Sequence, residues 1–345
     1  MKLGIVGLPG AGKTTLFAAL TQIVMDEDSH KPEDRLGTIR VPDKRVERLS
    51  VMYNPKKTIF AQVEYLLPYI PMQKPGQKKD ETSWSTVRTC DALIQVVRNF
   101  KGFGEEPATP LEDFARINEE MIFADLLVVE KRLERLELDQ KRGRKGDPEE
   151  LRLLLECKAL LETDKPLRHN PELAAAPQLR GFTFLSGKPM LIIFNNEDEE
   201  ENIPPVGDSL AGETYLAIRG RLEQELTQMD EEEAREYLAE FNISTSAMDR
   251  VISLSYEMLG LISFFTVGPD EVRAWTIKKD TQAVDAAEVI HSDIKKGFIR
   301  AEVVAYKDLM EAGSYKDARL RGTVRLEGKT YAVQDGDIIE FRFNV

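Results

Sequence analysis

The chain opens with MKLGIVGLPGAGKTTLF (residues 1–17), in which GLPGAGKT (7–14) fits the pattern G-x-x-x-x-G-K-[ST]. The apolar run KLGIVG (2–7) precedes the glycines, and TTLFAALT (14–21) follows them with its apolar residues at helical spacing. A strand, a glycine-rich loop and a helix in this order are typical of a phosphate-binding loop. The stretch therefore predicts an α/β domain that binds a nucleotide.

Two further apolar runs, ALIQVV (92–97) and MLIIF (190–194), are short and lack the polar alternation of a half-exposed strand. Runs of this kind are typical of central strands in a parallel sheet that is covered on both faces. We expect them to join the first strand in one doubly wound P-loop sheet. The expected nucleotide-binding domain comprises residues 1–125 and 182–262.

A different pattern separates the two halves of that domain. Between 126 and 138, apolar residues recur alternately three and four positions apart with charged residues between them, which is the pattern of a heptad seam. RGRKGDP (142–148) interrupts the pattern, and a second helical segment follows at 149–161. We predict an antiparallel helical hairpin inserted over 126–181. The pattern supports two roles for the hairpin equally well: an arm that contacts a partner, or a structural brace.

The last eighty-odd residues change in character. Alternating and β-branched residues predict several strands, and a helix is expected between the first two of them. The expected strands are 274–277, 299–304, 323–326 and 338–343, and the expected helix is 283–290. We therefore predict a small α+β domain over 263–345.

The overall composition excludes several classes of protein. The chain has 345 residues, a net charge of −13 and two cysteines. An acidic chain does not favour a broad grip on nucleic acid, so we expect no DNA partner. No apolar run approaches the roughly 20 residues of a membrane span, and two distant cysteines suggest no disulfide framework. We expect a cytoplasmic protein without a membrane partner.

The predicted loop defines the candidate ligand site. Its backbone N–H groups would surround a β-phosphate at the positive end of the following helix. Lys13 would bridge the β- and γ-phosphates, and the Thr14 hydroxyl would bind Mg²⁺. The candidate nucleotide-binding residues of the loop are Gly7, Pro9, Gly10, Ala11, Gly12, Lys13, Thr14 and Thr15. The expected ligands are ATP or GTP together with Mg²⁺.

A second candidate group follows the run at 190–194. The next residues are NNED (195–198), which resemble the base-reading pattern N-K-x-D. Asn195 and Asp198 keep the spacing, whereas Asn196 stands where a lysine would pack over the base. We predict that all three residues contact the purine base, which could be either adenine or guanine. The alternative is an acidic loop that begins with asparagine by coincidence.

Several stretches together resemble the Obg-like ATPase (YchF) family. They are residues 7–15, 91–98 and 195–198, and in the C-terminal part FFTVGP (264–269), EVRAWT (271–276), VIH (289–291), KGFIRAEV (296–303) and 333–345. The resemblance implies a nucleotide domain, a helical hairpin and a C-terminal TGS domain of β-grasp type, in that order. It also implies slow Mg²⁺-dependent ATP hydrolysis and a ribosome or structured RNA as partner, contacted through the TGS domain and the hairpin.

The chain departs from this family at the switch motifs. Where the family's D-x-x-G is expected, the sequence reads LPYI (67–70), and no switch threonine occurs in HKPEDR (30–35). We therefore expect nucleotide binding with weak or absent hydrolysis, and no catalytic residue is assigned. One alternative is a slow ATPase or GTPase that uses residues such as Glu64 or Thr38. Another is an interaction scaffold that works without nucleotide.

Overall fold

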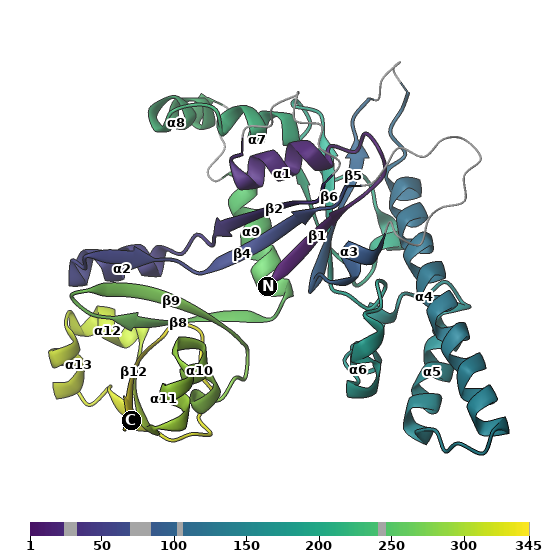
Figure 1. The fold of residues 1–345 in the computed structure, drawn as a ribbon. Helices are drawn as coiled ribbons and strands as arrows, with labels where there is room; N and C mark the ends of the chain where they lie inside the picture. Colours follow the sequence, from purple (N-terminus) through teal and green to yellow (C-terminus); the bar gives the residue numbers. More distant parts are fainter. Residues whose placement is uncertain (24–32, 70–83, 102–105, 241–245, 345) are drawn as a thin grey trace. The chain divides into compact units, whose positions relative to one another are not determined.

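The computed structural model describes residues 1–23, 33–69, 84–101, 106–240 and 246–344 (Figure 1). The chain divides into two compact units, each built from two segments. The first unit comprises Met1–Gly37 with Glu64–Met248, and the second comprises Thr38–Val63 with Asp249–Val345. None of the helices within the described ranges has both the length and the apolar composition of a membrane span.

A six-stranded sheet in the order β2-β4-β1-β5-β6-β7 forms the centre of the first unit. Its central pairs, β1 with β4 and β5, and β6 with β5 and β7, are all parallel. The strands are β1 (Lys2–Val6), β2 (Arg35–Arg40), β4 (Gln62–Leu67), β5 (Ala92–Asn99), β6 (Met190–Asn196) and β7 (Thr214–Ile218). The predicted doubly wound sheet is confirmed, and the two apolar runs are its buried strands β5 and β6.

Helices cover this sheet. The first half of α4 packs Phe114, Ile117 and Met121 into a buried cluster with side chains of β5 and β6. Helices α1 and α7 lie against each other, away from α4 (Figure 1). The helices of this unit are α1 (Lys13–Thr21), α3 (Ser85–Arg88), α4 (Pro110–Lys141), α5 (Pro148–Leu161), α6 (Pro171–Ala174), α7 (Gly220–Leu226) and α8 (Glu231–Glu240), with 3₁₀ turns η2 (Leu167–His169), η3 (Pro177–Phe182) and η4 (Gly207–Leu210).

Helices α4 and α5 form the predicted antiparallel hairpin, which is confirmed. Leu133 of α4 and Leu154 and Cys157 of α5 share a buried cluster with η2, α6 and η3. The carboxylate of Asp147 caps α5 by accepting the N–H of Glu149 at 2.9 Å. Helix α4 begins at Pro110, well before the expected start at 126, because its first half covers the sheet and only its second half belongs to the hairpin.

Asp125 fixes α4 at the point where the sheet-covering half meets the hairpin. Its side chain is fully buried and pairs with the Arg88 guanidinium at 3.0 Å. The N–H groups of Leu185 and Ser186 donate to its two oxygens at 3.0 and 2.7 Å. Burial raises the pKa of the Asp125 carboxyl, and these donors oppose that shift. Three otherwise separate segments are therefore held by one carboxylate.

The second unit is built on a sheet in the order β11-β10-β12-β8-β9-β3. Strand β12 pairs parallel with β8 between two antiparallel pairs, β10–β12 and β8–β9, as in a β-grasp fold. The elements are β8 (Leu261–Val267), β9 (Glu271–Lys278), α10 (Ala283–Ile290), α11 (Ser292–Lys296), β10 (Phe298–Ala305), α12 (Tyr306–Ala312), α13 (Tyr315–Leu320), β11 (Arg325–Glu327) and β12 (Asp337–Phe343), preceded by α9 (Ala247–Met258). The predicted C-terminal β-grasp fold is confirmed.

The sixth strand of this sheet comes from early in the chain. Strand β3 (Lys57–Ile59) pairs parallel with β9, and helix α2 (Lys44–Tyr53) packs against β8 and β9. Arg45 binds the carboxylate of Asp335 at 2.7 Å and lies over the ring of Phe265, 5.1 Å from its centroid. Residues 38–63 therefore group with the C-terminal residues, whereas the sequence pattern alone assigns all of 1–125 to the nucleotide domain.

Candidate nucleotide-binding site

The glycine loop connects the carboxyl end of β1 to the amino end of α1. Pro9, Gly10 and Thr14 are exposed, whereas Ala11 is buried and Gly12, Lys13 and Thr15 are half-buried. The first backbone bond of α1 runs from the N–H of Leu16 to the carbonyl of Gly12 at 2.9 Å. No side chain in the described part of the chain caps the helix. Its first N–H groups are therefore available to an external acceptor, as a phosphate site requires.

Lys13 curls back over the loop. Its Nζ donates to the carbonyl oxygens of Gly7 at 3.0 Å and Leu8 at 2.7 Å. No carboxylate among the described residues forms an ion pair with it. Burial lowers the pKa of Lys13, because a charged amine loses hydration there. A partly desolvated cation held only by neutral carbonyls would gain from a nearby anion.

Asn195 joins this loop to the next layer of the site. Its Nδ2 donates to the carbonyl of Ala11 at 3.1 Å, and its Oδ1 accepts the N–H of Gly220 at 3.0 Å. Asn195 leaves no room for a side chain at either of two nearby glycines. A Cβ at Gly12 would lie 2.2 Å from Asn195 Nδ2, and one at Gly220 would lie 2.6 Å from Asn195 Oδ1. Gly12 also has φ +92°, which side-chain-bearing residues rarely adopt. Asn195 thus links the glycine loop to the start of α7 by two hydrogen bonds.

The other two residues of the NNED stretch have different surroundings. Asn196 is buried, and its Nδ2 donates to the carbonyls of Glu200 at 3.0 Å and Asn202 at 2.8 Å, while its Oδ1 accepts from Asn99 at 2.8 Å. Its polar atoms therefore shape the loop after β6. The Asp198 side chain is 42% exposed, with Arg221 Nε 3.8 Å from its Oδ2. Of the pair, Asp198 is the one open to a ligand.

Sequence reasoning missed two residues of this arrangement. Asn99 lies outside the expected strand, which stops at residue 97, whereas β5 extends to Asn99. Nothing in the sequence connected Asn99 to Asn196. Gly220 lies two residues after β7, and a glycine close to a strand end was the available signal. Both act through hydrogen bonds that join separate strand ends.

Two residues named as substitute catalytic groups can also be placed. Glu64 pairs in register with Lys2, at the end of β1 far from the loop. Five residues of strand separate that level from Gly7, or about 16 Å. Thr38 lies in β2 and groups with the second unit. The stretch 67–70 is described only to Tyr69, and 30–35 only from Glu33, so their remaining residues lie outside the described ranges.

Comparison with known proteins places this geometry in a family. The chain is 38% identical to the ribosome-binding ATPase YchF of Bacillus subtilis (strain 168), over 99% of both chains. The chain belongs to the YchF family of Obg-like ATPases. It is also 35% identical to the Haemophilus influenzae YchF, over 100% of this chain and 99% of that protein. Obg-like ATPase 1 of Oryza sativa subsp. japonica is 32% identical, over 100% of this chain and 92% of that protein.

Two further comparisons agree with membership of the YchF family. The solved structure of the Schizosaccharomyces pombe YchF GTPase has a TM-score of 0.84 to this chain, at 30% identity, over 99% of this chain and 97% of that one. A family profile named for the YchF GTPase C-terminal region, described as "Protein of unknown function (DUF933)", matches residues 261–344. The family profile covers the β-grasp strands β8 to β12, and the match to the solved structure covers both units.

The role of Asn195 gives a testable expectation. Replacing it by alanine removes the bond to Ala11 and leaves the buried N–H of Gly220 without an acceptor, which typically costs about 1–3 kcal/mol. Asn195→Ala should therefore lower the free energy of unfolding by about that amount in urea titrations. The matched variant Asp198→Ala, whose side chain is 42% exposed, should change it by less than about 0.5 kcal/mol. Equal losses in the two variants would contradict the anchoring role.

Proposed function

We propose that this chain binds a purine nucleoside triphosphate, ATP or GTP, at residues 7–15. The observation that carries the proposal is the half-buried amine of Lys13, whose hydrogen-bond partners in the described part of the chain are two carbonyls beside the uncapped start of α1. Nucleotide phosphates supply the negative charge and the acceptor oxygens that both groups lack. Gly10 and Gly12 leave the close backbone approach that a phosphate needs.

The same chemistry fits a bound Mg²⁺. The described residues contain no group of three or more His, Cys, Asp or Glu side chains that could hold a metal alone. The Thr14 hydroxyl is exposed beside Lys13, and Mg²⁺ commonly takes one or two protein oxygens together with substrate phosphates. When bound, the ion would neutralise phosphate charge. Thr14 would hold it, and Asp198 would receive the N–H groups of the base, with Asn195 keeping the loop in position.

Hydrolysis is proposed to be weak or absent. Strand β4 ends at Leu67, and the next residues, Pro68 and Tyr69, offer no carboxylate; the N–H of Tyr69 donates to Asp34 at 2.8 Å. Glu64 is too far along β4 to replace a missing aspartate. Phosphoryl transfer depends on positioned charges, and loss of one such group typically costs ~3 kcal/mol, about a hundredfold in rate. The expectation of poor turnover rests on these local features.

The test is a calorimetric titration of the full chain with ATP, GTP and ADP in the presence of Mg²⁺, followed by measurement of phosphate release. Binding of a triphosphate with release no faster than the uncatalysed background supports the proposal. Release that disappears in Lys13→Ala would instead favour a slow ATPase or GTPase. If no nucleotide binds, the chain is an interaction scaffold and the proposed function is wrong.

The proposed macromolecular partner is the ribosome or a structured RNA, which would place the chain in the cytoplasm. The curated relatives carry the name ribosome-binding ATPase. The turn of the hairpin is a basic, exposed surface formed by Lys141, Arg142, Arg144 and Lys145, which suits RNA phosphates. The TGS-like β-grasp unit is the second proposed contact.

Charge reversal at the turn tests the ribosome proposal. We expect Lys141→Glu combined with Arg142→Glu to weaken co-sedimentation with ribosomes about tenfold and to reduce its dependence on salt. The matched control reverses Lys131 and Arg135, which are exposed on α4 away from the turn. Equal pelleting of the two double variants would exclude the turn as the ribosome contact.

A further inference from the structure

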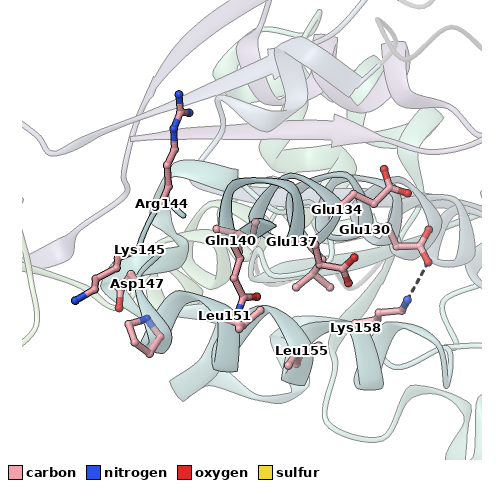
Figure 2. Close-up of a pocket in the computed structure, with 14 residues that line it drawn as sticks. Glu130, Glu134, Glu137, Gln140, Arg144, Lys145, Asp147, Leu151, Leu155 and Lys158 are labelled. Atoms are coloured by element: carbon pink, nitrogen blue, oxygen red, sulfur yellow. Dashed lines mark ion pairs between the residues drawn. The ribbon is translucent and has the colours of Figure 1, made fainter. Parts of the chain in front are cut away.

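The hairpin carries a groove that the proposed nucleotide site does not use, although Arg144 and Lys145 of the basic turn also line one end of it. It has a volume of about 860 Å³ and lies between α4 and α5 near their turn (Figure 2). One side of the hairpin packs against η2, α6 and η3, which buries Leu133, Leu154 and Cys157. Leu151 and Leu155 of α5 do not join that core and are 38% and 52% exposed. In the described part of the first unit, these two leucines of the groove are therefore not covered by η2, α6 or η3.

The floor of the groove is apolar. Leu133 and Leu136 line it from α4, and Leu151 and Leu155 line it from α5 at a spacing of one helical turn. In Figure 2 both labelled leucines lie along α5 beneath the side chains of α4. Exposed leucines in a concave site gain free energy when a second apolar surface covers them. Rows of this kind match the i, i+3 and i+4 spacing of apolar residues on a partner helix.

One wall of the groove is acidic. Glu130, Glu134 and Glu137 follow each other along one face of α4 and all line the groove. Glu130 is paired with Lys158 at 3.3 Å. No Lys, Arg or His in the described part of the chain forms an ion pair with Glu134 or Glu137. Arg144 and Lys145 also line the groove, at its turn end, and Arg144 is paired with Asp139 at 3.1 Å. Along α4, the carboxylates of Glu134 and Glu137 beside the apolar floor favour an occupant that carries both leucine-like and basic side chains.

We propose that this groove binds an amphipathic helix of a partner protein, with apolar residues on one face and Lys or Arg along its edge. Residues 130–140 of α4 span about 15 Å, which matches about ten residues or three turns of a docked helix. RNA phosphates could reach Arg144 and Lys145 at the turn end, but RNA is disfavoured over the apolar floor because Glu134 and Glu137 would repel its phosphates there. A second copy of this chain is disfavoured because both copies carry a net charge of −13.

The proposal is tested with a synthetic 14-residue helical peptide that has leucine at alternating spacings of three and four and lysine on the flanking positions. Fluorescence anisotropy measures its affinity for the full chain, beside a peptide with glutamate in place of lysine. Leu151→Ser with Leu155→Ser should weaken the lysine peptide at least about tenfold. Glu134→Lys with Glu137→Lys should weaken the lysine peptide and strengthen the glutamate peptide.

Two control variants lie on exposed positions of α4 outside the groove, Leu138→Ser and Glu119→Lys, and should leave both peptides unchanged. Far-UV circular dichroism checks that every variant is folded, which is expected because Leu151 and Leu155 are exposed. Lys13→Ala should bind the lysine peptide normally, so failure of the proposed nucleotide function does not affect this test.

Three results would overturn the proposal. In the first, the lysine peptide fails to bind or binds no better than the glutamate peptide. In the second, an RNA oligonucleotide binds the full chain and loses affinity in the Leu151→Ser, Leu155→Ser variant, which would make nucleic acid the occupant. In the third, sedimentation shows a dimer that the same variant abolishes, which would make the occupant a second copy.

Discussion

Replacing Lys13 by alanine is expected to reduce the affinity for ATP and GTP at least about a hundredfold. The amine is the one loop side chain that would carry a positive charge to the phosphates, and each charge-assisted hydrogen bond contributes about 1.5–3 kcal/mol. Two such bonds correspond to about 3 kcal/mol or more, or roughly two orders of magnitude in dissociation constant. Calorimetric titration of both proteins with ATP and Mg²⁺ measures the difference directly.

The same substitution should leave the fold intact. Burial lowers the pKa of Lys13, which means that its charge works slightly against the folded state. Removing the charge offsets the loss of its bonds to Gly7 and Leu8, and the free energy of unfolding should fall by less than about 1 kcal/mol. The exposed variant Lys44→Ala serves as the control for both measurements. Unchanged ATP affinity in Lys13→Ala would place the nucleotide at another site.

Asp125→Ala is the substitution expected to destabilise the first unit most. It leaves the Arg88 guanidinium without its carboxylate and the buried N–H groups of Leu185 and Ser186 without acceptors. Removing one partner of a buried ion pair typically costs 3–5 kcal/mol. We expect a loss of about that size in the free energy of unfolding, measured by urea titration of the full chain. Far-UV dichroism would report whether the hairpin unfolds first.

Asp139→Ala is the matched control, since Asp139 lies on the same helix and pairs at 3.1 Å with the exposed Arg144, its own side chain being 25% exposed. A surface pair of this kind contributes at most about 1 kcal/mol. If the two alanine variants lost the same stability, the buried carboxylate would not be the anchor of α4. Asp125→Asn, which keeps one acceptor oxygen, should fall between them.

The central sheet could be predicted from the sequence because its strands are continuous apolar runs. The runs at 92–97 and 190–194 became β5 and β6, and the glycine loop fixed the place of β1 and α1. Helix α4 was predicted only from residue 126, since its first half mixes charged residues with those that cover the sheet. The grouping of residues 38–63 with the C-terminal unit could not be predicted. The pairing of β3 with β9 does not affect the local sequence pattern of either strand.

The candidate site shows the same limit. Lys13 and the loop around it follow from one local motif, whose spacing carries its geometry. The spacing of Asn195 and Asp198 also drew attention to β6, but it did not reveal that Asn195 faces Ala11 and Gly220. It gave no indication that Asn196 turns to Asn99. These bonds join strands that are neighbours only in the folded sheet.

Strand β3 has a consequence for how the protein is made. Its neighbour Lys56 and the matching Asp270 before β9 are 214 residues apart in the chain. At synthesis rates of about 5–20 residues per second, β9 is synthesised about 10–40 s after α2 and β3, which pack against it. Any fragment that begins after residue 63 would leave one edge of β9 unpaired, and such an edge readily pairs with other chains. The C-terminal unit is therefore completed last during translation, although part of it is synthesised among the first.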